Sequence, residues 1–284
     1  MISQHPSLIA IVCLISVLQI TPVFLRRSTH FKRFGQVPGT LESNEIQSSS
    51  LFFKGQGFQP ETLGVRYGNI VLECEAGGSP PPTIHWLKNG IRISQGSSKN
   101  FAKHDEASLE DRRNRGNNML RLSSTRSRLF LDCLSTDSEG QYACVAENAM
   151  IRKSRTTYLK VENSEHTMYP EVRKCFGKPF KTGEPARIYM WTVSRLEYMN
   201  NMVQLFCRAQ GYPKPSITWY RDNKPIQSDD DDYQIAHNGD LIIKDITWEK
   251  HRFSYFCVAS NLFGTDAAEA FLYPTIQEDF GLPL

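Results

Sequence analysis

An all-β fold built from two tandem sandwiches is the fold class that this sequence predicts, because its main features each occur twice. Cys74 and Trp86 have the same spacing as Cys207 and Trp219. A buried cysteine followed at this distance by a buried tryptophan is typical of two sheets packed face to face. A pattern that repeats along a chain indicates two copies of one structural unit.

Two further matches support the duplication. Each Cys and Trp pair is followed by Tyr-x-Cys, once at residues 142–144 and once at 255–257. The residues that lead into each tryptophan share the pattern Gly-x-Pro-x-Pro-x-Ile-x-Trp, at 78–86 and at 211–219. Cys on strand B, Trp on strand C and a Tyr two residues before the Cys of strand F are the signature of an immunoglobulin-like domain. The sequence therefore predicts two such domains.

Alternation along the strands places these residues in the cores. Residues at every second position of a strand share one face, and apolar residues alternate around both strand B cysteines. We expect each tryptophan to pack on the disulfide that spans its sheets, and each tyrosine to offer its hydroxyl group to nearby backbone. The expected core structural residues are Trp86, Tyr142, Trp219 and Tyr255.

The cysteines indicate an oxidising compartment. Of the seven, Cys13 lies in an N-terminal apolar stretch, and its removal with that stretch leaves six. We expect disulfides between Cys74 and Cys144 and between Cys207 and Cys257. Such bonds persist outside the reducing cytosol, so the protein is expected to be secreted and extracellular.

Cys133 and Cys175 are predicted to form a third bridge. The apolar pattern around Leu129, Leu131 and Leu134 already fills the inward positions, so Cys133 should point away from the core. Cys175 lies between the two domains. A bridge would tie this segment to the first domain, whereas the alternative leaves both thiols free or pairs them between chains.

The predicted organisation has a leader, two domains and short connecting segments. The apolar stretch from Leu8 to Leu18 has the length of a signal-peptide core, although retention of this stretch as a membrane anchor is a second interpretation. The expected parts are a signal peptide at 1–25, a disordered leader at 26–57, immunoglobulin-like domains at 58–162 and 186–274, a linker at 163–185 and a C-terminal tail at 275–284.

Composition and motifs argue against several function classes. The formal net charge of +3 is small, so no nucleic acid partner is expected. The histidines show no metal-ligand spacing and the cysteines are assigned to disulfides, so no metal and no cofactor are expected. The chain lacks a nucleophile elbow, a phosphate-binding glycine loop and a zinc-protease motif, and no catalytic residue is predicted.

The first domain is longer than the second between its tryptophan and its second core cysteine. The extra residues fall near 96–118 and are strongly polar, so we expect a surface excursion that is either a flexible insert or a loop that contacts a partner. Arginines continue beyond it. Sulfated glycans are therefore a candidate partner, and a solvated face with dispersed charges is the alternative. These basic residues are Arg112, Arg113, Arg115, Arg121, Arg126, Arg128, Arg152, Lys153 and Arg155.

The second domain carries a more specific resemblance. Cys-Val-Ala-Ser-Asn-Leu-Phe-Gly at 257–264 resembles the hairpin of intermediate-set (I-set) immunoglobulin domains, so both domains are expected to be I-set. Residues 191–197 (Trp-Thr-Val-Ser-Arg-Leu-Glu), 238–248 and 270–274 resemble the nematode zwei-Ig secreted proteins. That family also has an insect relative that is a secreted, insulin-binding development factor. Relatives carry a cysteine near the E to F turn and one in the linker, which supports the third bridge.

The resemblance implies a binding protein and leaves two functions open. One is the capture of an extracellular protein or peptide ligand, insulin-like in kind, whose signalling the protein modulates. The other is an extracellular neuronal adhesion or axon-position maintenance factor that binds cell-surface immunoglobulin proteins. Exposed apolar residues between Tyr189 and Tyr198, including Met190 and Trp191, would suit a peptide groove, and ordinary core packing of the same residues is the alternative.

Overall fold

The computed structural model describes residues 49–96, 110, 112–163, 175, 183–227 and 231–277. The expected signal peptide and parts of the leader, insert, linker and C-terminal tail lie outside the described residues. Within the described ranges, no helix combines the length and apolar character needed to cross a membrane.

The first sandwich packs three strands, β1, β3 and β6, against a five-stranded sheet with the order β2-β8-β7-β4-β5. Its core lies between these layers and includes Leu72, Leu129 and Leu159. The elements are β1 (Ser50–Phe53), β2 (Glu61–Val65), β3 (Ile70–Ser79), β4 (Thr83–Lys88), β5 (Ile91–Arg92), β6 (Leu122–Leu131), a 3-10 turn (Thr136–Ser138), β7 (Gly140–Glu147) and β8 (Arg152–Glu162).

The second sandwich repeats this plan. Strands β10, β15 and β14 form a three-stranded sheet, and β9, β17, β16, β12 and β13 follow one another in the sheet opposite. The elements are β9 (Glu184–Tyr198), β10 (Val203–Leu205), β11 (Cys207–Tyr212), β12 (Ser216–Arg221), β13 (Lys224–Pro225), β14 (Tyr233–Ile235), β15 (Leu241–Ile243), the helix α3 (Trp248–His251), β16 (Ser254–Asn261) and β17 (Gly264–Thr275). The predicted all-β fold of two sandwiches is confirmed.

The two tryptophans are fully buried in their cores. Each indole N–H is nevertheless hydrogen-bonded, that of Trp86 to the Ser127 hydroxyl at 3.0 Å and that of Trp219 to the Gly239 carbonyl at 2.8 Å. A buried donor without an acceptor would cost about 1–3 kcal/mol, so these bonds let a large ring occupy the core.

The E to F corners of the two sandwiches differ in backbone but use the same contact. The Tyr142 hydroxyl donates to the Ser138 carbonyl at 2.8 Å, and the Tyr255 hydroxyl to the His251 carbonyl at 3.4 Å. The corner is a 3-10 turn in the first sandwich and the one-turn helix α3 in the second. In both turn types, the tyrosine hydroxyl therefore donates to the carbonyl of the residue four positions earlier.

Three disulfide bonds join the cysteines of the described residues. Cys74 on β3 is bonded to Cys144 on β7, across the two sheets of the first sandwich, and Cys207 on β11 is bonded to Cys257 on β16 in the second. A third bond joins Cys133 to Cys175. Cys133 adopts a positive φ of 54° directly after β6, which turns the chain away from the strand.

The expected disordered leader at 26–57 needs a correction at its end. Residues 50–53 form β1, which pairs with β3. Leu51 is buried, and Phe53 packs against the same core. Two apolar residues at alternate positions are enough for a short strand that completes the sheet. An alternation this short does not stand out from the polar sequence before it, so the sequence alone does not predict the strand.

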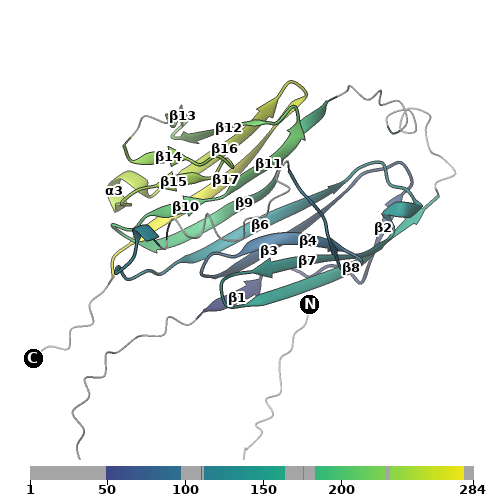
Figure 1. Cartoon of the computed structure of the whole chain (residues 1–284), viewed down its shortest axis with the longest axis horizontal. Helices are drawn as coiled ribbons and strands as arrows, with labels where there is room; N and C mark the ends of the chain where they lie inside the picture. The colour runs from purple at the N-terminus through teal and green to yellow at the C-terminus, as the bar shows by residue number, and fades with distance from the viewer. Residues whose placement is uncertain are drawn as a thin grey trace, which may run out of the picture. The chain divides into compact units, whose positions relative to one another are not determined.

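The two sandwiches share a sheet. Strand β9, the first strand of the second sandwich, pairs along β6 from Leu122 with Leu196 to Ser127 with Met190. Figure 1 shows these strands side by side, within one nine-stranded sheet. An edge strand exposes unpaired backbone groups, and here β9 covers the edge of β6. The two domains, which were expected as separate units, are therefore joined by backbone hydrogen bonds between β6 and β9.

Candidate functional site

The outer face of the shared sheet carries a shallow groove where the two sandwiches meet. The pairing registers place Phe52, Gly77, Ser124, Ser194 and Phe271 in one row across five strands, β1, β3, β6, β9 and β17. Because paired residues point to the same side of a sheet, this row lies on one face. Its middle residues are small and its ends are aromatic, which makes a floor with two walls.

A second row completes the groove. Leu122 on β6 pairs with Leu196 on β9, which pairs with Tyr273 on β17. The resulting cavity has a volume of about 150 Å³. We call it the junction groove, and it is lined by Phe52, Lys54, Leu122, Ser123, Ser194, Arg195, Leu196, Phe271 and Tyr273.

The aromatic walls are accessible to a ligand. Phe52 is 45% exposed, Phe271 42% and Tyr273 39%. Each is flanked along its strand by a buried residue, such as Leu272 between the last two. Large apolar side chains that gather on one face at this exposure are typical of a surface that binds another molecule. Both sandwiches contribute walls, so the groove exists only when β6 and β9 are paired.

Gly77 gives the Phe52 wall its position. A Cβ atom at residue 77 would lie 2.6 Å from the Phe52 ring. That distance is well below van der Waals contact, so the ring lies over the glycine backbone and covers β3. A glycine in the middle of a strand often marks such a close approach.

A charged cluster borders the floor. The Ser124 hydroxyl donates to Glu75 at 2.5 Å, and the Arg126 guanidinium forms an ion pair with the same carboxylate. Burial acts to raise the pKa of Glu75, but the bonds from Ser124 and Arg126 outweigh burial, and the pKa lies below its ordinary value. Glu75 therefore stays ionised and holds the Ser124 side chain down at the groove floor.

The segment 189–198 reaches the groove, but not through the residues expected. Met190 is 2% and Trp191 6% exposed, so the hypothesis that they form an exposed apolar surface is wrong. The Arg128 guanidinium lies 4.6 Å from the Trp191 ring centroid and covers it. Ser194 and Leu196 line the groove instead. Alternation along β9 and the β-bulge opposite residues 124 and 125 decide which side chains face outward.

Three of the arginines expected to attract sulfated glycans lie beside carboxylates. Arg126 and Arg128 form ion pairs with Glu73, and Arg113 lies 3.6 Å from Asp245. Neighbouring carboxylates reduce the positive potential at these three positions, and the glycan partner stays a prediction.

The insert of the first sandwich contacts the second sandwich on the reverse side of the shared sheet. Glu110 is 4% exposed and lies 3.0 Å from Arg195, which is itself buried. Asn114 exchanges two hydrogen bonds with the backbone of Met202, at 2.7 and 2.9 Å. The expectation of a surface excursion is therefore wrong for this part of the insert. Polar side chains can be buried here because the second sandwich supplies their partners.

The buried carboxylate of Glu110 is held by two groups. Besides Arg195, the backbone N–H of Gln204 donates to it at 2.5 Å. Burial raises the pKa of Glu110, and the nearby Arg195 opposes that rise. Sequence reasoning missed this pair because the two residues are far apart in the chain and neither belongs to an apolar pattern.

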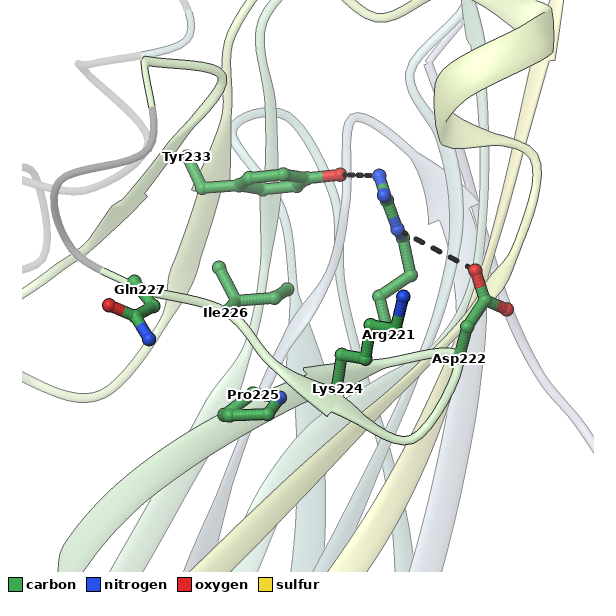
Figure 2. Close-up of a pocket in the computed structure, with 7 residues that line it drawn as sticks. All are labelled: Arg221, Asp222, Lys224, Pro225, Ile226, Gln227 and Tyr233. Carbon is green, nitrogen blue, oxygen red and sulfur yellow. Dashed lines mark hydrogen bonds and ion pairs between the residues drawn. The ribbon is translucent and has the colours of Figure 1, made fainter.

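A larger cleft of about 460 Å³ lies at the β12 to β13 hairpin of the second sandwich. Figure 2 shows Arg221 between Tyr233 and Asp222. The guanidinium donates to the Tyr233 hydroxyl at 2.5 Å and to the Lys250 carbonyl at 3.2 Å, and it lies 3.8 Å from Asp222. Arg221 is thus already bound to other groups of the cleft, so the junction groove is the better candidate for a ligand.

Metal-ligating residues do not gather in the described part of the chain. No three His, Cys, Asp or Glu side chains there come together in an arrangement that would hold a metal ion.

Comparisons with known proteins agree with this architecture. A family model described as an immunoglobulin domain matches residues 58–148 and 190–261. The zwei Ig domain protein zig-2 of Caenorhabditis elegans is 30% identical over 220 residues, which cover 77% of this chain and 84% of the relative. The neural/ectodermal development factor IMP-L2 of Drosophila melanogaster is 26% identical over 211 residues, covering 74% and 72%.

A solved structure shows the same fold. The crystal structure of the neural ectodermal development factor IMP-L2 superposes with a TM-score of 0.59 at 22% sequence identity. The match covers 84% of this chain and all of the solved chain.

Proposed function

We propose that this chain, which belongs to the immunoglobulin-domain family and within it to the group of zwei Ig domain proteins, is an extracellular binding protein. It captures a peptide ligand in the junction groove. The proposed ligand is insulin-like, and its capture keeps it from a receptor. The insulin-like character comes from the family resemblance. The groove itself is the observation that carries the proposal.

Three properties of the groove support peptide capture. Its walls are accessible aromatic rings, which are enriched among the residues that dominate binding energy at protein interfaces. Its floor of Ser124, Ser194 and Gly77 is flat and small, so a ligand side chain can approach the backbone. The paired strands β6 and β9 hold the walls in place before binding, which lowers the ordering cost of association.

The extracellular location is supported by the disulfides. Three bonds join all six cysteines of the described residues, and such bonds are rare in reducing compartments.

The alternative function, adhesion through cell-surface immunoglobulin proteins, is favoured by one other surface. Leu262 is 89% exposed on the turn between β16 and β17, and Tyr212 is 67% exposed at the end of β11. The Asn261 side chain holds this tip by donating to the carbonyls of Glu184 and Pro213, at 2.7 and 2.9 Å. A rigid apolar tip suits contact with another folded protein.

A binding assay distinguishes the two functions. The purified chain would be titrated by calorimetry with a panel of insulin-like peptides that includes human insulin. We expect submicromolar binding, and we expect Phe271→Ala with Tyr273→Ala to weaken it by roughly 2 kcal/mol or more, about 30-fold, because aromatic anchors dominate such interfaces.

The matched control is Leu262→Ala, which removes a more exposed apolar side chain away from the groove and should leave the affinity unchanged. Thermal unfolding of each variant verifies that the fold is intact. Absence of binding across the whole panel would instead support the adhesion function.

A further inference from the structure

Glu197 is a buried carboxylate directly behind the junction groove. It follows the groove residue Leu196 on β9, points to the reverse side of the sheet and is 0% exposed. One oxygen accepts hydrogen bonds from the backbone N–H groups of Leu120 at 2.7 Å and Tyr198 at 2.9 Å. The other accepts from the backbone N–H of Arg121 at 3.0 Å.

The charge of this carboxylate is compensated from one side. Arg195, also buried, lies 3.0 Å from the second oxygen, and the same guanidinium nitrogen is 3.0 Å from Glu110. Asn201 donates to the first oxygen at 3.3 Å and to the carbonyl of Asn118 at 2.8 Å. The segment that enters β6 is therefore anchored to β9 and to the residues after it by side chains of the second sandwich.

The anchored residues lead directly into the groove. Leu120 and Arg121 precede Leu122, whose side chain forms part of the groove lining. A β-bulge interrupts the pairing of β6 with β9 between Ser124 and Thr125. Beyond this bulge only three residue pairs join the strands at this end, and short strand ends open readily without local anchors.

We propose that Glu197 is a positioning residue of the junction groove. By binding the backbone of residues 120 and 121, it holds Leu122 in register with Leu196 and so sets the distance between the groove lining contributed by the first sandwich and the walls contributed by the second. This inference rests on the proposed function for its consequence in binding, while the positioning of residues 122–124 is testable without a ligand.

A carboxylate is required at this position because both oxygens act as acceptors. In Glu197→Gln, one oxygen becomes an NH₂ group, which has only hydrogens to present. Whichever way the amide is turned, it faces at least one backbone N–H and loses that bond. The variant keeps the shape of the side chain and removes its second acceptor, so its effect reports on the hydrogen bonds.

The test uses a background in which the two sandwiches cannot separate. Thr125 and Thr192 are directly paired across β6 and β9 on the other side of the bulge, and Thr125→Cys with Thr192→Cys supplies an interdomain disulfide there, verified by mass mapping. In this background we would compare the parent with Glu197→Gln by amide hydrogen exchange and by calorimetric titration with human insulin or the tightest peptide of the panel.

We expect Glu197→Gln to speed exchange at residues 122–124 at least tenfold more than in β15, where exchange follows the global stability, and to weaken peptide binding by roughly tenfold. The matched control is Asp240→Asn. It alters another fully buried carboxylate, one that accepts from the Cys207 backbone at 2.9 Å and from Gln204 at 3.0 Å, away from the groove.

Each outcome decides the inference. Local exchange and affinity that change in Glu197→Gln but not in Asp240→Asn support it. Unchanged exchange at residues 122–124 overturns it, as does an affinity that falls equally in both variants. If the parent protein binds no peptide, the proposed function fails, and the exchange data alone then decide whether Glu197 positions Leu122.

Discussion

At the scale of single residues, neighbouring groups set the protonation state of a buried side chain. His251 illustrates this at the E to F corner of the second sandwich, where it is 1% exposed. The backbone N–H of Thr247 donates to its Nδ1 atom at 2.9 Å, so the ring proton lies on Nε2. Burial lowers the pKa of His251, Arg221 and Lys250 lower it further, and Asp232 acts in the opposite direction.

This lowered pKa predicts a loss of stability in mild acid. As the pH falls below about 6.5, the unfolded chain binds a proton at residue 251 while the folded chain does not, so folding becomes less favourable. The loss continues until the pH reaches the lowered folded-state pKa. We expect the drop in the free energy of unfolding between pH 7.5 and 5.5, measured with urea, to be smaller in His251→Gln than in the parent. Equal drops would contradict the assignment.

At the scale of elements, Cys175, the described residue between the two sandwiches, is tied to the first sandwich. The bond between Cys133 and Cys175 holds residue 175 beside the first sandwich, where the Cys175 sulfur lies 3.4 Å from the Tyr67 carbonyl. The Asn69 side chain accepts from the Cys133 backbone N–H at 3.1 Å.

Removal of this bond should cost measurable stability. The two cysteines are 42 positions apart, for which the chain-entropy model gives about 4 kcal/mol, and observed values are typically about 2–4 kcal/mol. We expect Cys133→Ser with Cys175→Ser to lower the free energy of unfolding in urea by this amount while the other two disulfides remain. A change below roughly 0.5 kcal/mol would show that the bond constrains neither state.

At the scale of the whole described chain, the two sandwiches are in direct contact with each other. The β6 to β9 pairing, the Glu110 to Arg195 ion pair and the Asn114 contacts all connect them. The Trp86 indole N–H also donates to Ser127, whose hydroxyl donates to the Tyr189 carbonyl on β9. These contacts run from the core of one sandwich to the backbone of the other.

Such coupling predicts cooperative unfolding. Leu129→Ala in the core of the first sandwich should destabilise by about 2–5 kcal/mol. If the sandwiches unfold together, amide hydrogen exchange in β15 of the second sandwich should accelerate with the global stability. Exchange in β15 that is unaffected would show independent domains. Ile91→Ala, at a 75% exposed position, is the control and should change neither quantity.

Much of the fold followed from local patterns. The repeated Cys, Trp and Tyr positions predict two sandwiches because alternation along a strand and the approach of two sheets constrain residues close together in the chain. The groove could not be predicted in this way. Its lining includes Phe52, Leu122, Leu196 and Tyr273, which only strand pairing brings together. The hypothesis of an exposed apolar surface at Met190 and Trp191 was wrong, because both residues are buried, as the alternative of ordinary core packing predicts.

The sequence by itself determined the number of sandwiches and their fold class, because these depend on short-range periodicity that a single chain displays twice, and the family was implied by the resemblance of motifs in the second domain. Only the tertiary structure decided that β9 lies against β6, that Glu110 and Arg195 are buried together and that one groove spans both sandwiches. The physical reason is that an edge strand accepts any partner with free backbone groups. Its choice of β9 rests on side-chain contacts between segments far apart in the chain.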